Sequence, residues 1–147
     1  MKSFLRPSLL AVIAFAVIPF TTTRAETFFA INVSSPLLVS GSAGVYLGNE
    51  IELANMPLRP VLEGEAGIGG GKLLIGFDSI GEGLGVGLKG SLLRTWFEPI
   101  GADKNTTYMG MELQGGISSI VLSLGGYRRI DGDGDGWLGT ISLGIRL

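Results

Sequence analysis

The feature that most constrains this chain is an alternation of apolar residues with small or polar ones. The stretches LGVGLK (residues 84–89) and ISLGIRL (residues 141–147) show it without interruption. Eight segments of this kind run from residue 29 to residue 147, and none carries a helical stripe. A period of two is typical of strands whose two faces differ. The sequence therefore predicts an all-β protein.

Turn signals separate the eight segments. They are SSP, NEIELANMPLRP, GGG, SIGEG, EPIGADKN, GGI and DGDGDG. Pro36, Pro57, Pro60 and Pro99 lie in or beside these breaks, and proline cannot donate a hydrogen bond to a strand ladder. We therefore expect residues 49–60, NEIELANMPLRP, to connect two strands.

The N-terminus has the layout of a secretory signal peptide. Lys2 and Arg6 precede an apolar run over residues 9–20, and Thr23 and Ala25 are small residues at the positions that precede a cleavage site. The run of about a dozen residues is shorter than the roughly 20 that a spanning helix needs. The sequence predicts a signal peptide over residues 1–25 and a single domain over residues 26–147.

The predicted domain is acidic and contains no cysteine. Cleavage would remove three of the 11 basic residues and none of the 13 acidic ones. A nucleic-acid-binding protein needs a clustered basic face, so this charge balance argues against that class. Without cysteine, a lipoprotein anchor and a disulfide framework are both excluded.

The residues on the two faces of each segment predict the environment of each face. A transmembrane barrel turns its apolar face to lipid and its small, polar face inward. The segments are about as long as the 9–11 residues that cross a bilayer, and their polar face is rich in glycine, as the narrow interior of eight strands requires. We predict a closed antiparallel up-and-down transmembrane β-barrel of about eight strands. The residues expected to face lipid include Leu84, Val86, Leu88, Ile141, Leu143 and Ile145.

In this pattern the chain resembles the small, eight-stranded bacterial outer-membrane β-barrel proteins. Its ending, GWLGTISLGIRL, looks like the C-terminal strand that the outer-membrane assembly machinery recognises, although Leu147 is not aromatic. The resemblance implies a place in the outer membrane, contact with its lipid and lipopolysaccharide, and recognition by the assembly machinery. We expect a monomer.

Charged residues occur on the face that is predicted to point inward. They are Glu63, Glu65, Lys72, Asp78, Lys89, Glu112 and Arg146. Buried charges must be paired, and a narrow interior gives them only one another as partners. The sequence therefore predicts an ion-pair network inside the barrel.

The stretch DGDGDG brings together Asp131, Asp133 and Asp135. It resembles the first half of an EF-hand loop, but position 12 of that loop would be Ser142 instead of the required glutamate. Asp-Gly is also a strong hairpin signal, so we favour a turn between the last two strands. Weak calcium binding is the alternative.

The catalytic inventory is small. Without histidine or cysteine, the usual nucleophile arrangements and zinc sites are excluded. We expect no enzyme activity and no cofactor, and predict a structural or interaction role. The alternatives are an exported soluble β-sandwich or β-clam that binds an apolar ligand, because the same alternation serves both folds, and a lipid-modifying enzyme. The small barrels that act on acyl chains rely as families on a histidine that is absent here.

Overall fold

The computed structural model describes residues 25–79, 84–97, 99–131 and 136–147, and this part of the chain is built from nine β-strands. Their bounds are β1 Glu26–Ser35, β2 Leu38–Tyr46, β3 Ile51–Leu53, β4 Met56–Gly67, β5 Gly70–Ser79, β6 Leu84–Thr95, β7 Thr107–Ile117, β8 Ile120–Arg129 and β9 Trp137–Arg146. The described residues include no helix long and apolar enough to cross a membrane.

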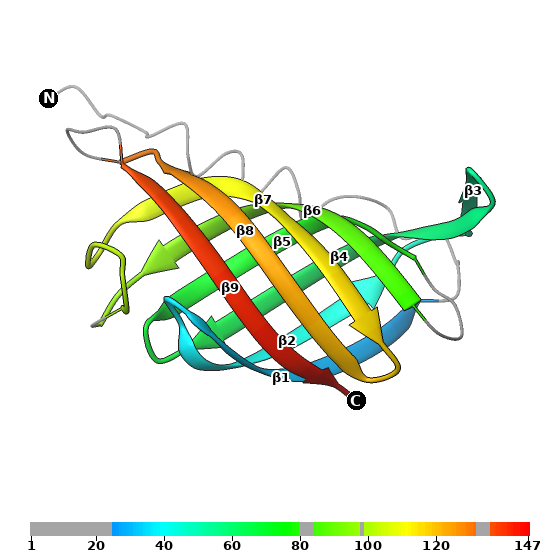
Figure 1. Cartoon of the computed structure of the whole chain (residues 1–147), viewed down its shortest axis with the longest axis horizontal. Coiled ribbons are helices and arrows are strands. Elements are labelled where there is room, and N and C mark those ends of the chain that lie inside the picture. The colour runs from blue at the N-terminus through cyan, green and yellow to red at the C-terminus, as the bar shows by residue number, and fades with distance from the viewer. Residues whose placement is uncertain (1–24, 80–83, 98, 132–135) are drawn as a thin grey trace, which may run out of the picture.

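Eight of these strands close into a barrel, as the alternation predicted (Figure 1). Each strand pairs antiparallel with its neighbours in chain order, β2 pairs with β4, and β1 pairs with β9 to close the sheet. The short strand β3 pairs only with β4 in the part of the chain that the structure describes. The prediction of a closed antiparallel barrel of eight strands is therefore confirmed.

Residues 49–60 connect two barrel strands, as expected, but they do so largely as a hairpin and not as an irregular break. β3 and the first residues of β4 pair across a two-residue turn, in which Ala54 and Asn55 adopt positive φ values of 51° and 62°. Pro57 and Pro60 both lie within β4, where the strand extends past its ladder with β2. A missing N–H is tolerated there because that strand edge is not needed to close the barrel.

The barrel has two distinct ends. At the terminal end lie Glu26, Leu147 and the last residues of β2, β5 and β7. At the loop end lie the turns that follow β1 and β4, residues 99–106 of the β6–β7 loop, the last residues of β8 and the first residues of β9. Figure 1 shows β3 and the C-terminus at the terminal end.

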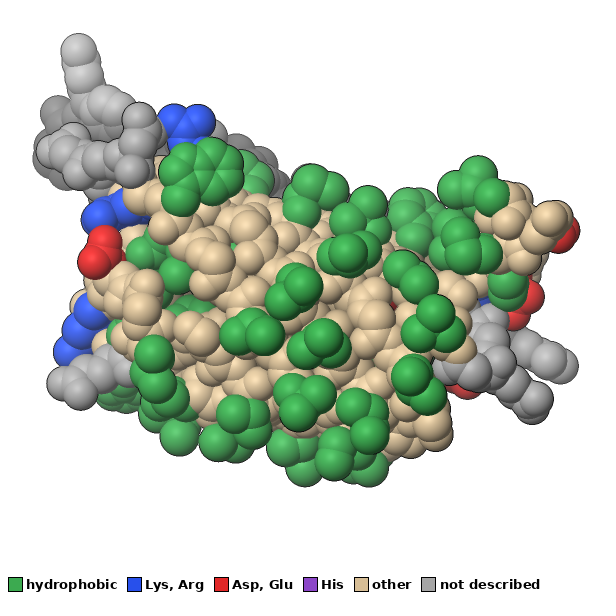
Figure 2. Space-filling model, viewed as in Figure 1, with side chains coloured by type: hydrophobic (Ala, Val, Ile, Leu, Met, Phe, Trp, Pro, Cys, Tyr) green, Lys and Arg blue, Asp and Glu red, His purple; other side chains and the backbone are tan. Residues whose placement is uncertain are grey.

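The outer wall of the barrel is apolar. Leu84, Val86, Leu88, Ile141, Leu143 and Ile145 are between 41% and 71% exposed. Figure 2 shows hydrophobic side chains over the visible wall, whereas charged side chains gather at the two ends. The burial pattern is thus inverted relative to a soluble protein, because large apolar residues cover the outside of the wall whereas charged residues such as Glu63 and Lys89 are buried inside it.

Candidate functional site

The most distinctive site is the charged interior of the barrel. The structure places all seven of the charged residues that the alternation assigned to the inward face inside the wall. Glu63, Glu65, Lys72, Asp78, Lys89 and Glu112 are buried, and the Arg146 side chain is 25% exposed. They come from β4, β5, β6, β7 and β9, so they join strands that are not neighbours in the sheet.

One group of these charges is centred on Lys72. Its ammonium lies 2.9 Å from Glu65 Oε2 and 2.8 Å from Glu112 Oε1. Each carboxylate also accepts a hydroxyl hydrogen bond, from Ser40 at Glu65 and from Tyr127 at Glu112. Two carboxylates thus share one buried cation, which links β5 to β4 on one side and to β7 on the other.

The second group is centred on Lys89, whose side chain is fully buried. Its Nζ lies 2.7 Å from Glu63 Oε2 and 3.2 Å from Asp78 Oδ2, and donates a 2.8 Å hydrogen bond to Gln114 Oε1. Asp78 also pairs at 3.4 Å with the Arg146 guanidinium. In this group two cations meet two carboxylates, so the formal charges balance.

The terminal end of the interior opens into a polar cavity. This cavity has a volume of about 160 Å³, and Tyr46, Gln114 and Arg146 are among its lining residues. Arg146 also lines a cavity of about 10 Å³ deeper in the barrel, beside both groups of charges. A space of that size holds about one water molecule. The interior between the two charge groups is therefore filled by side chains.

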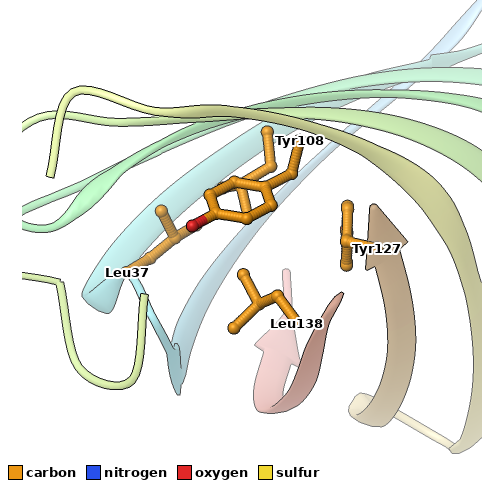
Figure 3. Packing of buried hydrophobic residues seen from close by; sticks show 5 residues of the cluster. Leu37, Tyr108, Tyr127 and Leu138 are labelled. Atoms are coloured by element: carbon orange, nitrogen blue, oxygen red, sulfur yellow. The ribbon is translucent and has the colours of Figure 1, made fainter. Parts of the chain in front are cut away.

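The loop end of the interior is closed by apolar side chains. In Figure 3 the side chains of Leu37, Tyr108, Tyr127 and Leu138 gather at this end, Leu37 from the turn after β1 and the other three from strands of the wall. We call this cluster the plug; its buried members are Leu37, Leu93, Tyr108, Tyr127 and Leu138. Tyr127 belongs to both regions, because its ring packs in the plug and its hydroxyl donates to Glu112.

Asp131, the first of the three aspartates in DGDGDG, takes part in an ion-pair cluster at the loop end. Its Oδ2 lies 2.7 Å from Arg94 Nη1 and accepts a 2.8 Å hydrogen bond from Thr107 N. Partial desolvation acts to raise the pKa of this carboxyl. The hydrogen bonds from Thr107, with the charges of Arg94 and Arg129, nevertheless hold the pKa below its usual value.

The calcium alternative for this loop rests largely on residues that the structure does not describe. Asp133 and Asp135 lie outside the described residues. Among the residues that are described, no three acidic side chains are grouped so that they could hold a metal ion.

Sequence reasoning missed several uncharged members of the site. Tyr127, Gln114 and Ser40 hydrogen-bond to the charged groups, yet a search for charges passes over them. A signal was present, because each lies in the inward phase of its own segment. Leu74 is also buried although it is apolar, since the inward phase includes it.

Two inward glycines let these groups approach the wall. A Cβ atom at Gly87 would collide with the Asp78 carboxylate, and one at Gly125 would meet Thr140, Tyr127 and Glu112. The glycine-rich face is therefore a packing requirement of the narrow interior.

The arrangement as a whole joins strands of the barrel through buried ion pairs. Its carboxylates and ammonium groups engage one another at ion-pair distances. No protein-family model matches the chain, and neither a curated protein nor a solved structure is significantly similar to it.

Proposed function

We propose that this protein is a membrane-spanning barrel of the bacterial outer membrane with a structural or interaction role. The observation that carries the proposal is the inverted polarity of the wall. Leu143, at 56% exposure, stands for the apolar outer face, whereas Lys89 inside it is fully buried. A soluble monomer rarely exposes more than a few hundred Å² of continuous apolar surface.

The soluble carrier is less well supported. A β-clam or sandwich that binds an apolar ligand needs an apolar cavity inside the fold. Here the central interior is lined by charged groups such as Glu63, Lys72 and Glu112, and the cavity among them measures about 10 Å³. An apolar ligand would have to displace buried ion pairs, which is costly.

The same filling of the interior argues against a pore. The plug closes the loop end, and the two charge groups occupy the middle of the barrel. An eight-stranded barrel has an interior just wide enough for side chains. A lipid-modifying activity has no support beyond the fold, because the chain lacks histidine and cysteine.

In this role the apolar wall contacts outer-membrane lipid. With the termini on the periplasmic side, the loop end faces the lipopolysaccharide of the outer leaflet. Nucleic acid is not among the expected partners, and the last strand, β9, is the element that the assembly machinery would recognise.

Cell fractionation followed by gel electrophoresis of heated and unheated samples tests the proposal. We expect the protein in the outer-membrane fraction and a faster-migrating unheated form, because a closed barrel stays compact. Recovery in the soluble periplasmic fraction, without a shift on heating, would contradict the proposal.

A pair of variants tests the membrane-facing wall directly. Leu143→Arg places a charge on the outer wall and should destabilise the inserted barrel by about 2–4 kcal/mol if the position is near the midplane. Leu53→Arg is the matched control, because Leu53 lies on the β3–β4 hairpin beyond the wall. Equal effects of the two substitutions on unfolding in lipid vesicles would show that the wall does not face lipid.

A further inference from the structure

Among the described residues, part of β9 has a free edge at the loop end of the barrel. Its ladder with β1 covers Ile141 to Arg146. At the loop end the ladder stops at Ile141, because the chain turns at the end of β1. Residues 137–140 continue for four positions beyond the ladder, paired only with β8 among the described residues. This is a local gap in an otherwise closed sheet.

The phase of the ladder shows which backbone groups face the gap. Leu147 N donates to Phe29 O on β1, whereas Arg146 N donates to Ser119 O on the β8 side. Odd-numbered residues of β9 therefore point their N–H and C=O groups toward β1. At Trp137 and Gly139 these groups point into the gap, and no backbone hydrogen bond joins them to another described residue.

A groove lies beside this free edge. Its volume is about 340 Å³, and it runs between residues 101–103 of the β6–β7 loop and residues 136–138. Tyr108 and Leu138, both members of the plug, also line it. The β6–β7 loop is attached to the end of β1, because the Ser35 hydroxyl donates a 3.0 Å hydrogen bond to Ile100 O.

We propose that this edge and groove bind an extended peptide segment of a partner protein, which adds to β9 as a strand. Strand addition needs unpaired backbone groups at alternate positions and pockets for alternate side chains. Trp137 and Gly139 supply the unpaired backbone groups, and the groove beside Leu138 supplies a pocket for a side chain. The inference deepens the interaction role proposed above and rests on it.

The geometry also specifies the segment. Its residue opposite Leu138 points into the groove, which Ala102, Tyr108 and Leu138 line together with the polar Asp103, so a side chain with an apolar body such as leucine fits there. Its residue opposite Gly139 lies on the outer face, where a Cβ atom added to this glycine would meet nothing within 4 Å. A bulky outward side chain fits over that bare position.

The test is a titration of the folded barrel, in detergent micelles, with a capped synthetic peptide of alternating Thr and Leu. Amide hydrogen exchange at Trp137 and Gly139 is measured, and we expect both amides to exchange about tenfold more slowly at saturation. The same peptide with N-methyl groups at every second residue is the control, since it cannot complete the ladder. Unchanged exchange at both amides, or equal protection by the two peptides, would overturn the proposal.

A variant sharpens the result. Gly139→Pro removes the N–H that faces the gap but keeps the bonds to β8, so the barrel should fold and the peptide should no longer bind. Binding that survives this substitution contradicts strand addition. Because the titration is done in micelles, a failure to bind is separate from a failure of the protein to reach the outer membrane.

Discussion

The two halves of the barrel interior are filled differently. Toward the loop end, five apolar or aromatic side chains pack into the plug. From the middle to the terminal end, Lys72 and Lys89 organise four carboxylates, and a polar cavity opens beyond Arg146. Both halves hold the same wall together, but the loop half relies on apolar packing, whereas the terminal half combines paired charges with a smaller apolar cluster of Phe28, Tyr46 and Val61.

This difference determines which substitutions each half of the interior can accept without a large loss of stability. An apolar cluster loses stability in proportion to the contacts that a substitution removes. A buried charge group depends on balance, because one missing partner leaves another charge buried and alone. The halves should therefore respond differently to single and to combined substitutions.

The largest effect is expected from breaking the charged half at Lys72. Lys72→Met leaves Glu65 and Glu112 without their shared cation, at a cost of about 3–5 kcal/mol. Neutralising the acids as well, with Glu65→Gln and Glu112→Gln, should recover most of this loss. Urea unfolding in lipid vesicles measures the stability of the single Lys72 variant and of the triple variant. If the triple variant loses as much stability as the three single changes added together, the pairing is refuted.

Breaking the plug should cost slightly less. Leu93→Ala opens a cavity at a fully buried position and should destabilise the barrel by about 2–5 kcal/mol. Leu92→Ala is the matched control on the next residue, since Leu92 is 44% exposed on the outer wall. Comparable losses in the same unfolding assay would mean that the plug is not a packed core.

A smaller loss of stability is expected from adding a side chain to the tightly packed charged half. A side chain at Gly87 would run into the Asp78 carboxylate, so Gly87→Val should cost about 1–3 kcal/mol. Gly126→Val places the same side chain where nothing lies within 4 Å, and its effect should stay within about 0.5 kcal/mol. A neutral Gly87 variant would show that the interior is looser than the ion-pair distances imply.

The smallest effect concerns Asp131 at the loop end. Its pKa is lowered in the folded protein, so its contribution to stability is present above the ordinary aspartate pKa of about 4 and is lost as the pH falls through the lower folded value. Asp131→Asn should remove this part of the pH dependence. Thermal unfolding of both proteins across this range measures it, and identical pH profiles would exclude the ion-pair role.

Much of the fold was predictable because alternation is a local property. A residue such as Glu63 is assigned to the inward face by its neighbours alone. Its partner Lys89 lies two strands away in the sheet, and that contact depends on strand stagger, which one sequence does not specify. The candidate site was therefore predictable as a set of inward charges, and its pairing was not.

The errors and gaps have physical causes as well. Residues 49–60 contain strand residues that the sequence did not predict, because their prolines signal a break although the strand edge there can do without the N–H groups. The plug was overlooked because Leu37 and Tyr108 come from a turn and from a strand end, where alternation gives little guidance.

The short ladder between β1 and β9 has a consequence for the order of folding. It contains six register pairs, whereas β6 and β7 share eleven, and it joins opposite ends of the described chain. Bringing distant segments together costs more entropy than closing a hairpin, so this ladder should form after the hairpins on either side of it. The same reasoning runs backward: when the folded barrel opens, it should part first along this line, leaving the remaining strands as one curved sheet that can close again without refolding from the beginning.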